Sequence, residues 1–532
     1  MFQISTYFSL AYLVLLGITV VLCVVLPKNL RRLTLLFSSW LFFFSISGKL
    51  IIYLILTIAT VFNTAIWLSN VQKEQDAAAK DLDRETKKLI KAKYQRKQRG
   101  ILALCGGINI ALLLMLKYSP FAATNINTLL RLMGASYQIR VPSFIIPIGI
   151  SFYTLQAVAY LFDVYRKKIQ ADPNPIRFAL FMSFFPQIME GPICRYSDTA
   201  YELWNLERVR FENLILGGER IIFGFMKKMV VADRLNMFIN EVFTHYFLYD
   251  GFVNALAMVC YTLQLYMDFS GTMDVVIGSA QIFGIKMPEN FQRPFFSVTI
   301  SEFWKRWHIT LGTWFKDYIF YPVTMSKPMK HMTSKARKKL GNHYGPLIAG
   351  GVSLFCVWIC NGIWHGAGWH YIFFGMYHFA LILGGNMLEP LAIKTAARLK
   401  INRKSLPYRV MQMARTTVLV CLGELFFRAH GLRAGLVMFK KIFTEFSLAT
   451  LMDGSLFTLG MDIFDYYIII VSVIMIFVIS LLQEKGINLR QSLQKKNLAV
   501  QFTAVYALIM FIVIFGAYGQ GYIPVDPIYA GF

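Results

Sequence analysis

The chain has 532 residues, 56% of them hydrophobic, and a mean hydropathy of +0.51, which is too apolar for a soluble protein of this length. Its formal net charge is +25, yet Lys and Arg lie in short connectors between apolar runs, where they orient membrane helices and meet anionic lipid. We therefore predict an all-α polytopic protein of the cell (plasma) membrane that binds no nucleic acid.

Three apolar runs open the chain, at residues 7–26, 34–47 and 50–69, and predict membrane helices. The basic residues 28–32 indicate a cytoplasmic connector, which places the N-terminus outside the cytoplasm. Residues 73–99 then carry ten Lys or Arg and five Asp or Glu without Gly or Pro. This pattern predicts a cytoplasmic basic helix at the inner leaflet.

Two further apolar runs follow, at residues 101–117 and 142–162. The next run, FALFMSFFPQIMEGPICRY, is broken by two prolines and a glycine and holds Glu190 among apolar residues. Irregular backbone at membrane depth is tolerated only where it is buried in protein or lines a cavity. We expect this stretch and Glu190 to lie against a central cavity, and an interfacial helix is the alternative.

Apolar helices are also predicted at residues 214–231 and 254–267, and the second leads into YMDFSGTMD. A carboxylate near the centre of a bilayer costs about 2.5 to 3.5 kcal/mol, so Asp268 should have a partner. Tyr266, Ser270 or an Arg could provide it. Asp268 is therefore either a buried structural anchor or part of a functional site.

Six of the eight histidines lie within residues 301–379. Two of them have apolar, aromatic neighbours: His308 in RWHITL and His365 in NGIWHGAG. Burying an imidazole costs free energy unless it is hydrogen-bonded, so an ionisable residue in a membrane segment is a functional hypothesis by default. We predict that His365 performs chemistry.

One helix is expected to carry His308 on an aromatic face, because four residues follow helical spacing: Trp304, Trp307, His308 and Leu311. A basic cytoplasmic loop is predicted after it, at residues 327–339. Apolar residues 346–360 then lead outward and residues 369–388 return. His365 falls at the turn between these two runs.

Three apolar runs complete the chain, at residues 410–427, 466–482 and 502–518. Basic connectors at residues 394–409 and 484–496 are predicted to be cytoplasmic, which places the C-terminus outside. In total we expect about 10–12 transmembrane or re-entrant helices around a central cavity.

The apolar runs place N-terminal membrane helices in residues 1–141, with the basic helix 73–99, and C-terminal membrane helices in residues 430–532.

Five motifs, in this order, resemble the membrane-bound O-acyltransferase superfamily, and within it the bacterial alginate O-acetyltransferase branch and the related D-alanyl transfer protein of teichoic acid synthesis. The resemblance covers residues 142–429 and implies that they form the catalytic core. The motifs are FFPQIMEGPICRY, YTLQLYMDFSGTMDVVIGSAQIFGI, PFFSVTISEFWKRWHITLGTWFKDYIFYP, NGIWHGAGWHYIFFGMYH and FFRAHGLRAG.

The resemblance implies that an acyl group passes from a cytoplasmic donor, through a tunnel across the membrane, to a hydroxyl acceptor outside. The catalytic histidine of the family's WHG motif matches His365, and its second histidine matches His308. We expect Asn361 to orient the imidazole of His365 from one helical turn away. Further orienting or tunnel-lining candidates are Trp364, Trp307, Asp268, Tyr266, Ser270 and Glu190. The chain departs from the family pattern at Phe374 and Phe379, which affects local packing.

Acyl transfer to a hydroxyl needs a base, and an imidazole with a pKa near 6.5 suits that role at neutral pH. No GxSxG elbow occurs, and no Ser or Cys is spaced against His365 as a nucleophile would be, which favours direct transfer over a covalent intermediate. His370 and His378 do not share a helix face with His365, so we expect no metal site and no bound cofactor.

Three functions remain open at this stage. The first is O-acetylation of an extracellular or cell-wall polysaccharide, directly or through an acetyl-relay partner, with acetyl-CoA as the thioester donor. The second is D-alanyl transfer to teichoic acid from a thioester on an acyl carrier protein. The third is a transporter or flippase with a proton relay, which would require inverted repeats that we do not find. An extracytoplasmic acetyltransferase-like or esterase-like partner would fit the first function.

Overall fold

The computed structural model describes residues 4–518, so the predicted positions of the two chain ends lie outside the described residues. This part of the chain contains helices and no strand; an isolated antiparallel bridge joins Phe291 and Trp307. The prediction of an all-α protein is therefore confirmed. The described chain forms two compact units, residues 4–218 with 276–288, and residues 219–275 with 289–518.

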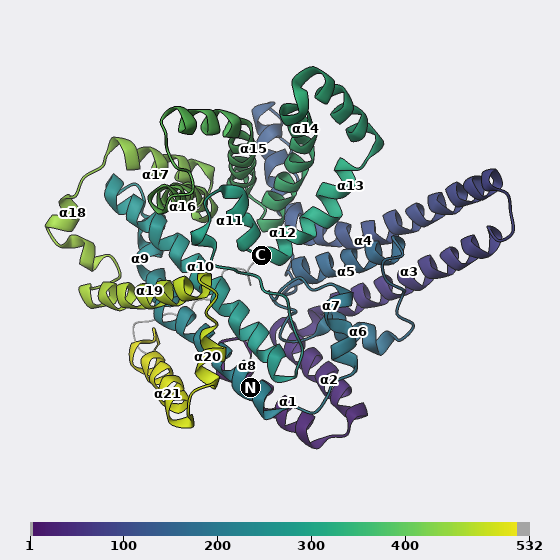
Figure 1. Cartoon of the computed structure of the whole chain (residues 1–532), viewed down its shortest axis with the longest axis horizontal. Helices are drawn as coiled ribbons and strands as arrows, with labels where there is room; N and C mark the ends of the chain where they lie inside the picture. The colour runs from purple at the N-terminus through teal and green to yellow at the C-terminus, as the bar shows by residue number, and fades with distance from the viewer. Residues whose placement is uncertain (1–3, 519–532) are drawn as a thin grey trace. The chain divides into compact units, whose positions relative to one another are not determined.

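In the first unit α3, α4 and α5 contact one another, and the α3–α4 hairpin projects outward (Figure 1). α8 and α10 each have residues in both units. The helices of the first unit, with these two, are α1 (Leu10–Val25), α2 (Lys28–Ser47), α3 (Ile51–Ala78), α4 (Arg84–Leu132), α5 (Ile150–Tyr165), α6 (Pro175–Ser183), α7 (Tyr196–Trp204), α8 (Phe211–Phe225) and α10 (Gly251–Ile282).

In the second unit α14 packs on α15, and α15 also packs on α16. Two π-helical turns, Met226–Ala232 and Lys316–Phe320, interrupt the α-helices. The helices are α9 (Asp233–Thr244), α11 (Ile300–Arg306), α12 (Ile309–Phe315), α13 (Tyr321–Thr324), α14 (Lys327–His365), α15 (Trp369–Arg398), α16 (Leu406–Arg428), α17 (Leu432–Thr444), α18 (Ala449–Met452), α19 (Ile463–Glu484), α20 (Leu489–Gln494) and α21 (Leu498–Phe515).

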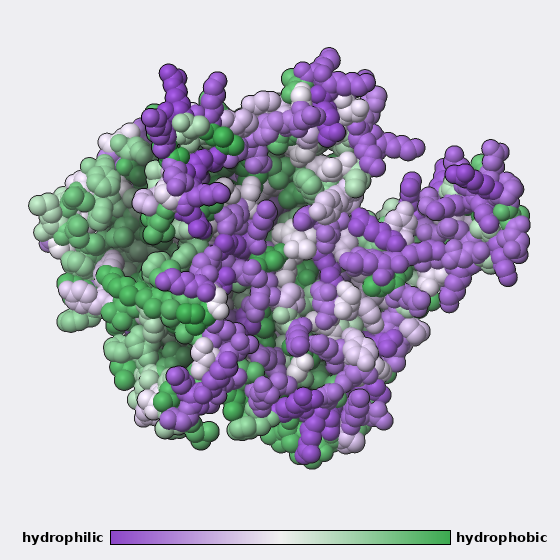
Figure 2. Space-filling view, viewed as in Figure 1, coloured by the Kyte–Doolittle hydropathy of each residue, from purple (hydrophilic) through white to green (hydrophobic). Residues whose placement is uncertain are grey.

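Seven helical segments of the described chain are long and apolar enough to cross a membrane. The first of these segments joins α2 and α3 through the short 3-10 turn Gly48–Leu50, and α1 is a shorter apolar helix. Hydrophobic surface over α19 and α21 is visible in Figure 2. The protein is thus a multi-pass membrane protein, while the central tunnel and the number of 10–12 helices stay predictions.

The basic stretch at residues 73–99 is not one helix. α3 ends at Ala78, a turn follows, and Asp83 begins α4 by accepting hydrogen bonds from the backbone N–H groups of Glu85 and Thr86. The basic residues therefore lie at the hydrophilic tip of an antiparallel hairpin (Figures 1 and 2). Because α4 continues without a break from the basic tip into the apolar run 101–117, a separate connector helix was a wrong prediction.

The expected irregular stretch around Glu190 is confirmed. α6 ends at Ser183, and residues 184–195 contain no helix. These residues are buried, and the hydroxyl of Tyr7 fixes the segment by donating to the carbonyl of Phe185 and accepting from the N–H of Met189. Pro186 and Pro192 lack the backbone N–H that a continuing helix would use.

The predicted basic loop at residues 327–339 is instead the first part of α14. Gly341, with φ of 78°, introduces a kink between this basic part and the apolar stem that ends at His365. Two glycines let α14 and α15 approach closely: a Cβ at Gly362 would lie 2.5 Å from the carbonyl oxygen of Tyr371, and one at Gly375 2.4 Å from that of Trp358.

Candidate active site

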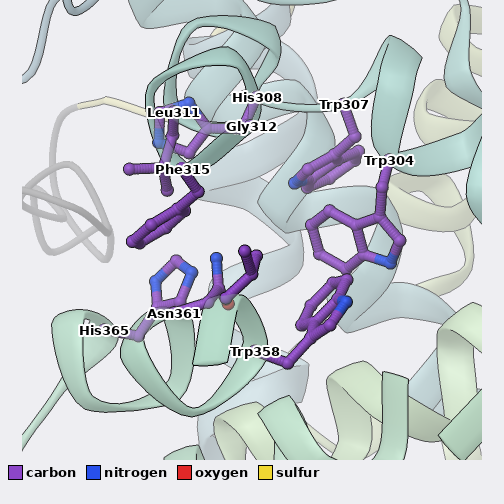
Figure 3. Close-up of a pocket in the computed structure, with 10 residues that line it drawn as sticks. Trp304, Trp307, His308, Leu311, Gly312, Phe315, Trp358, Asn361 and His365 are labelled. Atoms are coloured by element: carbon purple, nitrogen blue, oxygen red, sulfur yellow. The ribbon is translucent and has the colours of Figure 1, made fainter. Parts of the chain in front are cut away.

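A cavity of about 50 Å³ in the second unit is lined by both histidines that the sequence selected. His365 and Asn361 reach it from α14 and face Leu311 and Phe315 of α12 across it (Figure 3). The complete lining is Trp304, Trp307, His308, Leu311, Gly312, Phe315, Val357, Trp358, Asn361 and His365. None of these side chains carries a carboxylate, an ammonium or a guanidinium group.

His308 reaches the cavity from a break between two helices. α11 ends at Arg306, and His308, with φ of 47° and ψ of 52°, precedes α12. Here the backbone pairs with the segment before α11: the N–H of Gln292 donates to the carbonyl of Arg306, and the N–H of Ile309 to that of Asn290. The single continuous helix expected through Trp304 and Leu311 was therefore wrong, although its predicted face does line the cavity.

Asn290 fixes the orientation and the tautomer of His308. The Asn290 Oδ1 accepts from the backbone N–H of Thr310 at 3.0 Å and from its hydroxyl at 2.9 Å, which identifies this atom as the amide oxygen. His308 Nδ1 lies 3.2 Å from the same oxygen and must donate, so the lone pair of the ring is on Nε2. Burial lowers the pKa of His308 to about 3, and the imidazole is neutral at physiological pH.

His365 is the last residue of α14 and is 2% exposed. Its ring contacts Phe427 edge-on, with centroids 5.1 Å apart, and Phe374 at 6.0 Å. Trp364 joins the two histidines, because its ring centroid lies 4.9 Å from that of His365 and 5.9 Å from that of His308. The two imidazoles thus share one aromatic environment.

Asn361 lines the cavity, as the helical spacing predicted, but its amide makes no hydrogen bond to His365. Its Oδ1 is buried and has no hydrogen-bond partner among the described residues. The amide therefore faces the cavity, and its orienting role stays a prediction.

Asp268 does have a partner, as expected, but the partner is Lys228. The Lys228 ammonium lies 2.7 Å from Asp268 Oδ1 and 2.8 Å from Asp233 Oδ1. Lys228 belongs to the π-helical turn Met226–Ala232, in which the neighbouring Lys227 pairs with Asp274 at 2.6 Å. The ion pair supports the reading of Asp268 as a buried structural anchor, outside the residues that line the cavity.

Some of the other predicted candidates line the cavity and others do not. Trp307 lines the cavity and stacks on Phe303 at 5.3 Å, and Tyr266 packs behind it with ring centroids 5.9 Å apart. Ser270 accepts a hydrogen bond from Lys227, and Glu190 is buried in the first unit; neither lines the cavity. No group of three His, Cys, Asp or Glu side chains among the described residues could hold a metal ion.

The comparison with protein families decides the class. Residues 42–337 match the membrane-bound O-acyltransferase (MBOAT) family. The chain belongs to this family. The matched residues include His308 and end before His365, which lies in α14.

Several curated MBOAT relatives are bacterial. The chain is 34% identical over 353 residues to a probable alginate O-acetylase AlgI of Pseudomonas syringae pv. tomato, covering 66% of this chain and 62% of the relative. It is 30% identical over 358 residues to the peptidoglycan O-acetyltransferase of Helicobacter pylori, covering 62% of each. It is 31% identical over 249 residues to the teichoic acid D-alanyltransferase of Bacillus subtilis, covering 46% of this chain and 59% of the relative.

The chain therefore spans about three fifths of the length of these relatives. Membership of the MBOAT family favours acyl transfer over a transporter or flippase. Sequence reasoning missed Asn290, which orients His308, and Lys228, which pairs with Asp268 outside the cavity. Asn290 is 18 residues from His308, and Lys228 is 40 residues from Asp268, so no helical period could connect either pair.

Proposed function

We propose that the protein is a membrane O-acyltransferase that transfers an acetyl group from a thioester donor to hydroxyl groups of an extracellular or cell-wall polysaccharide, or to a relay partner of that polysaccharide. The observation that carries this proposal is the cavity shared by His308 and His365. The acetyltransferase names of the AlgI and peptidoglycan relatives support the acetyl group and the polysaccharide acceptor.

In the proposed reaction, His365 removes the proton of the acceptor hydroxyl as its oxygen attacks the thioester carbonyl. A new ester C–O bond forms, the C–S bond breaks, and the thiolate leaves and takes up the proton from the imidazolium. A positioned general base of this kind contributes about 10² to 10⁴-fold in rate. The acetyl group thus passes directly from the thioester to the hydroxyl, without a covalent enzyme intermediate.

His308 supplies the second nitrogen. Asn290 holds its Nδ1–H, so Nε2 can accept a hydrogen bond from the acceptor hydroxyl or the departing thiol. Since burial keeps this imidazole neutral, it can accept without competing protonation. We assign His365 the role of base and His308 the role of orienting acceptor.

The cavity favours acetyl over D-alanyl transfer. A D-alanyl group carries an ammonium, and burying an ammonium without a carboxylate partner is costly. The lining has no carboxylate to pair with it.

The donor and the partners are part of the proposal. We expect acetyl-CoA or another acetyl thioester to arrive at the cytoplasmic face and to act as a co-substrate, with no bound cofactor. An extracytoplasmic acetyltransferase-like or esterase-like protein would complete transfer where a relay is used. The basic connectors of the chain support the cytoplasmic placement of the donor face.

The test supplies radiolabelled acetyl-CoA to membranes containing the protein and follows label into the polysaccharide fraction. His365→Ala should lower the transfer rate about 10³-fold with normal insertion into the membrane. His331→Ala is the matched control, because His331 is an exposed histidine of the same helix and should retain full activity.

Normal transfer in His365→Ala would refute the assignment of His365 as the base. Transfer of label from a D-alanyl carrier-protein thioester, with none from acetyl-CoA, would refute the acetyl proposal and establish the D-alanyl alternative.

A further inference from the structure

A third buried histidine lies directly behind the cavity wall. His378 of α15 is 0% exposed, and its Nδ1 accepts a hydrogen bond of 3.2 Å from the indole Nε1–H of Trp304. Trp304 lines the cavity, whereas His378 does not. The imidazole therefore contacts a wall residue from the side that faces away from the reacting groups.

The contacts of His378 define its ring orientation. An indole N–H only donates, so Nδ1 must carry the lone pair and Nε2 the proton. The imidazole also stacks on Trp358, with centroids 5.4 Å apart and planes at 29°, and meets Phe374 edge-on at 4.7 Å. Trp358 is itself a wall residue and packs edge-on against Trp304 at 5.0 Å.

α16 holds the other side of the imidazole. A Cβ built at Gly423 would lie 2.6 Å from His378 Nε2, so the glycine leaves the space that the ring occupies. The hydroxyl of Tyr377, the neighbour of His378, donates to the carbonyl of Leu419 at 2.8 Å and ties α15 to α16 at this level. His378 is thus held by two helices and points its hydrogen-bond acceptor at one atom of the cavity wall.

We propose that His378 is a positioning residue that fixes the indole of Trp304 as the end wall of the acyl pocket and so limits the length of the acyl group. The inference rests on the proposed acyl-transfer function. Trp304 and Trp358 are the largest side chains of the lining besides Trp307, and they lie at the end of the cavity away from His365 (Figure 3), so a few ångströms of movement in one of them changes the length of the cavity. The hydrogen bond selects one indole orientation that packing alone would leave adjustable.

The test compares two substitutions of His378. In His378→Asn the amide oxygen takes the place of Nδ1 and can accept from the indole, whereas His378→Leu has similar bulk and no acceptor. Purified protein in lipid nanodiscs is assayed with acetyl-CoA and butyryl-CoA. The selectivity ratio is kcat/KM for acetyl-CoA divided by kcat/KM for butyryl-CoA. It should fall about tenfold in His378→Leu, since a pocket discriminates one or two methylene groups by at least that factor. In His378→Asn it should change less than about threefold.

A double-mutant cycle with Trp304→Phe separates positioning from packing. Phenylalanine has no N–H to hold, so His378→Leu should not change the selectivity ratio further in that background. An equal change in both backgrounds, or a loss in His378→Asn as large as in His378→Leu, would overturn the proposal.

A measurement without turnover keeps this inference distinct from the proposed function. In protein labelled with 5-fluorotryptophan, the ¹⁹F resonance that disappears in Trp304→Phe belongs to Trp304. This resonance should shift further in His378→Leu, which loses the hydrogen bond, than in His378→Asn, which keeps it; an equal shift in the two variants would overturn the proposal. Wild-type protein that does not consume acetyl-CoA but shows the expected shift would refute the proposed function alone.

Discussion

Two helical hairpins of this protein are each built from helices that are long and apolar enough to cross a membrane, but their interiors differ. In the α3–α4 hairpin the turn lies at the basic end, and a buried amide pair joins the helices, with Gln98 Nε2 donating to Gln75 Oε1 at 2.8 Å. In the α14–α15 hairpin the turn lies at the apolar end, and His365 is buried beside it.

One glycine from each hairpin shows how closely the helices pack. A Cβ at Gly106 of α4 would meet nothing within 4 Å, whereas one at Gly375 of α15 would meet the backbone of α14. The length of the apolar helices does not distinguish the two hairpins. The candidate site lies in the hairpin whose helix backbones approach closely and whose histidines are buried.

After His365, the largest effect is expected for the second histidine of the cavity. His308→Ala removes the acceptor nitrogen and should lower kcat for acetyl transfer about 100-fold. Asn290→Ala should have a smaller effect of about tenfold, because the imidazole remains but its tautomer is no longer fixed. Rapid-quench measurement of a single turnover checks both variants, and full activity in His308→Ala would confine this residue to a structural role.

Replacing a glycine by alanine should change the free energy of unfolding differently in the two hairpins. Gly375→Ala forces a methyl group into the backbone of α14 and should destabilise the protein by about 1 to 3 kcal/mol. Gly106→Ala should be neutral or stabilising by up to about 1 kcal/mol, since its Cβ meets open space and alanine favours helix. Thermal unfolding in detergent measures both, and Gly384→Ala, also in open space on α15, is the control on the same helix.

Removing a buried amide should lower kcat in one hairpin and not in the other. Asn361→Ala should lower kcat about tenfold, because its Oδ1 faces the cavity and has no hydrogen-bond partner among residues 4–518. Gln98→Ala should leave kcat unchanged, since its amide is satisfied by Gln75 within the other hairpin. Steady-state kinetics with acetyl-CoA decide this, and equal losses in the two variants would contradict the contrast.

The smallest effect concerns pH. His308 has a pKa of about 3 in the folded protein and about 6.5 when exposed, so between these values the unfolded chain binds a proton that the folded chain does not. The free energy of unfolding should therefore decrease as pH falls below about 6.5, by about 0.7 kcal/mol between pH 7 and pH 6. Tm measured across this range should change less in His308→Gln, and an unchanged slope would argue against the buried neutral imidazole.

Sequence reasoning found what local pattern and motif can show. The apolar runs gave the helices, and His308 and His365 were selected because each is an imidazole among aromatic residues, a pattern that needs no partner to be noticed. The proline-rich stretch around Glu190 was predicted as irregular for the same local reason.

The features that sequence reasoning missed depend on contacts between distant segments. The break at His308 is enforced by backbone pairing with residues 290–292, which helical spacing cannot reveal. Lys228 and Asp268 are partners across different helices, and His378 was considered only as a metal ligand because Trp304 is 74 residues away. The helical period relates residues within one helix, whereas these residues contact partners in other helices or segments.

The π-helical turn Met226–Ala232 has a consequence for how this sequence can change. Such a turn holds one residue more than an α-helix of the same height, so removing a residue there would rotate the following helix by about 100° relative to the preceding one. Asp233 and the two lysines could then no longer all face their present partners, and a stranded buried charge costs several kcal/mol. We expect related sequences to keep both lysines of this turn and to tolerate no change in its length.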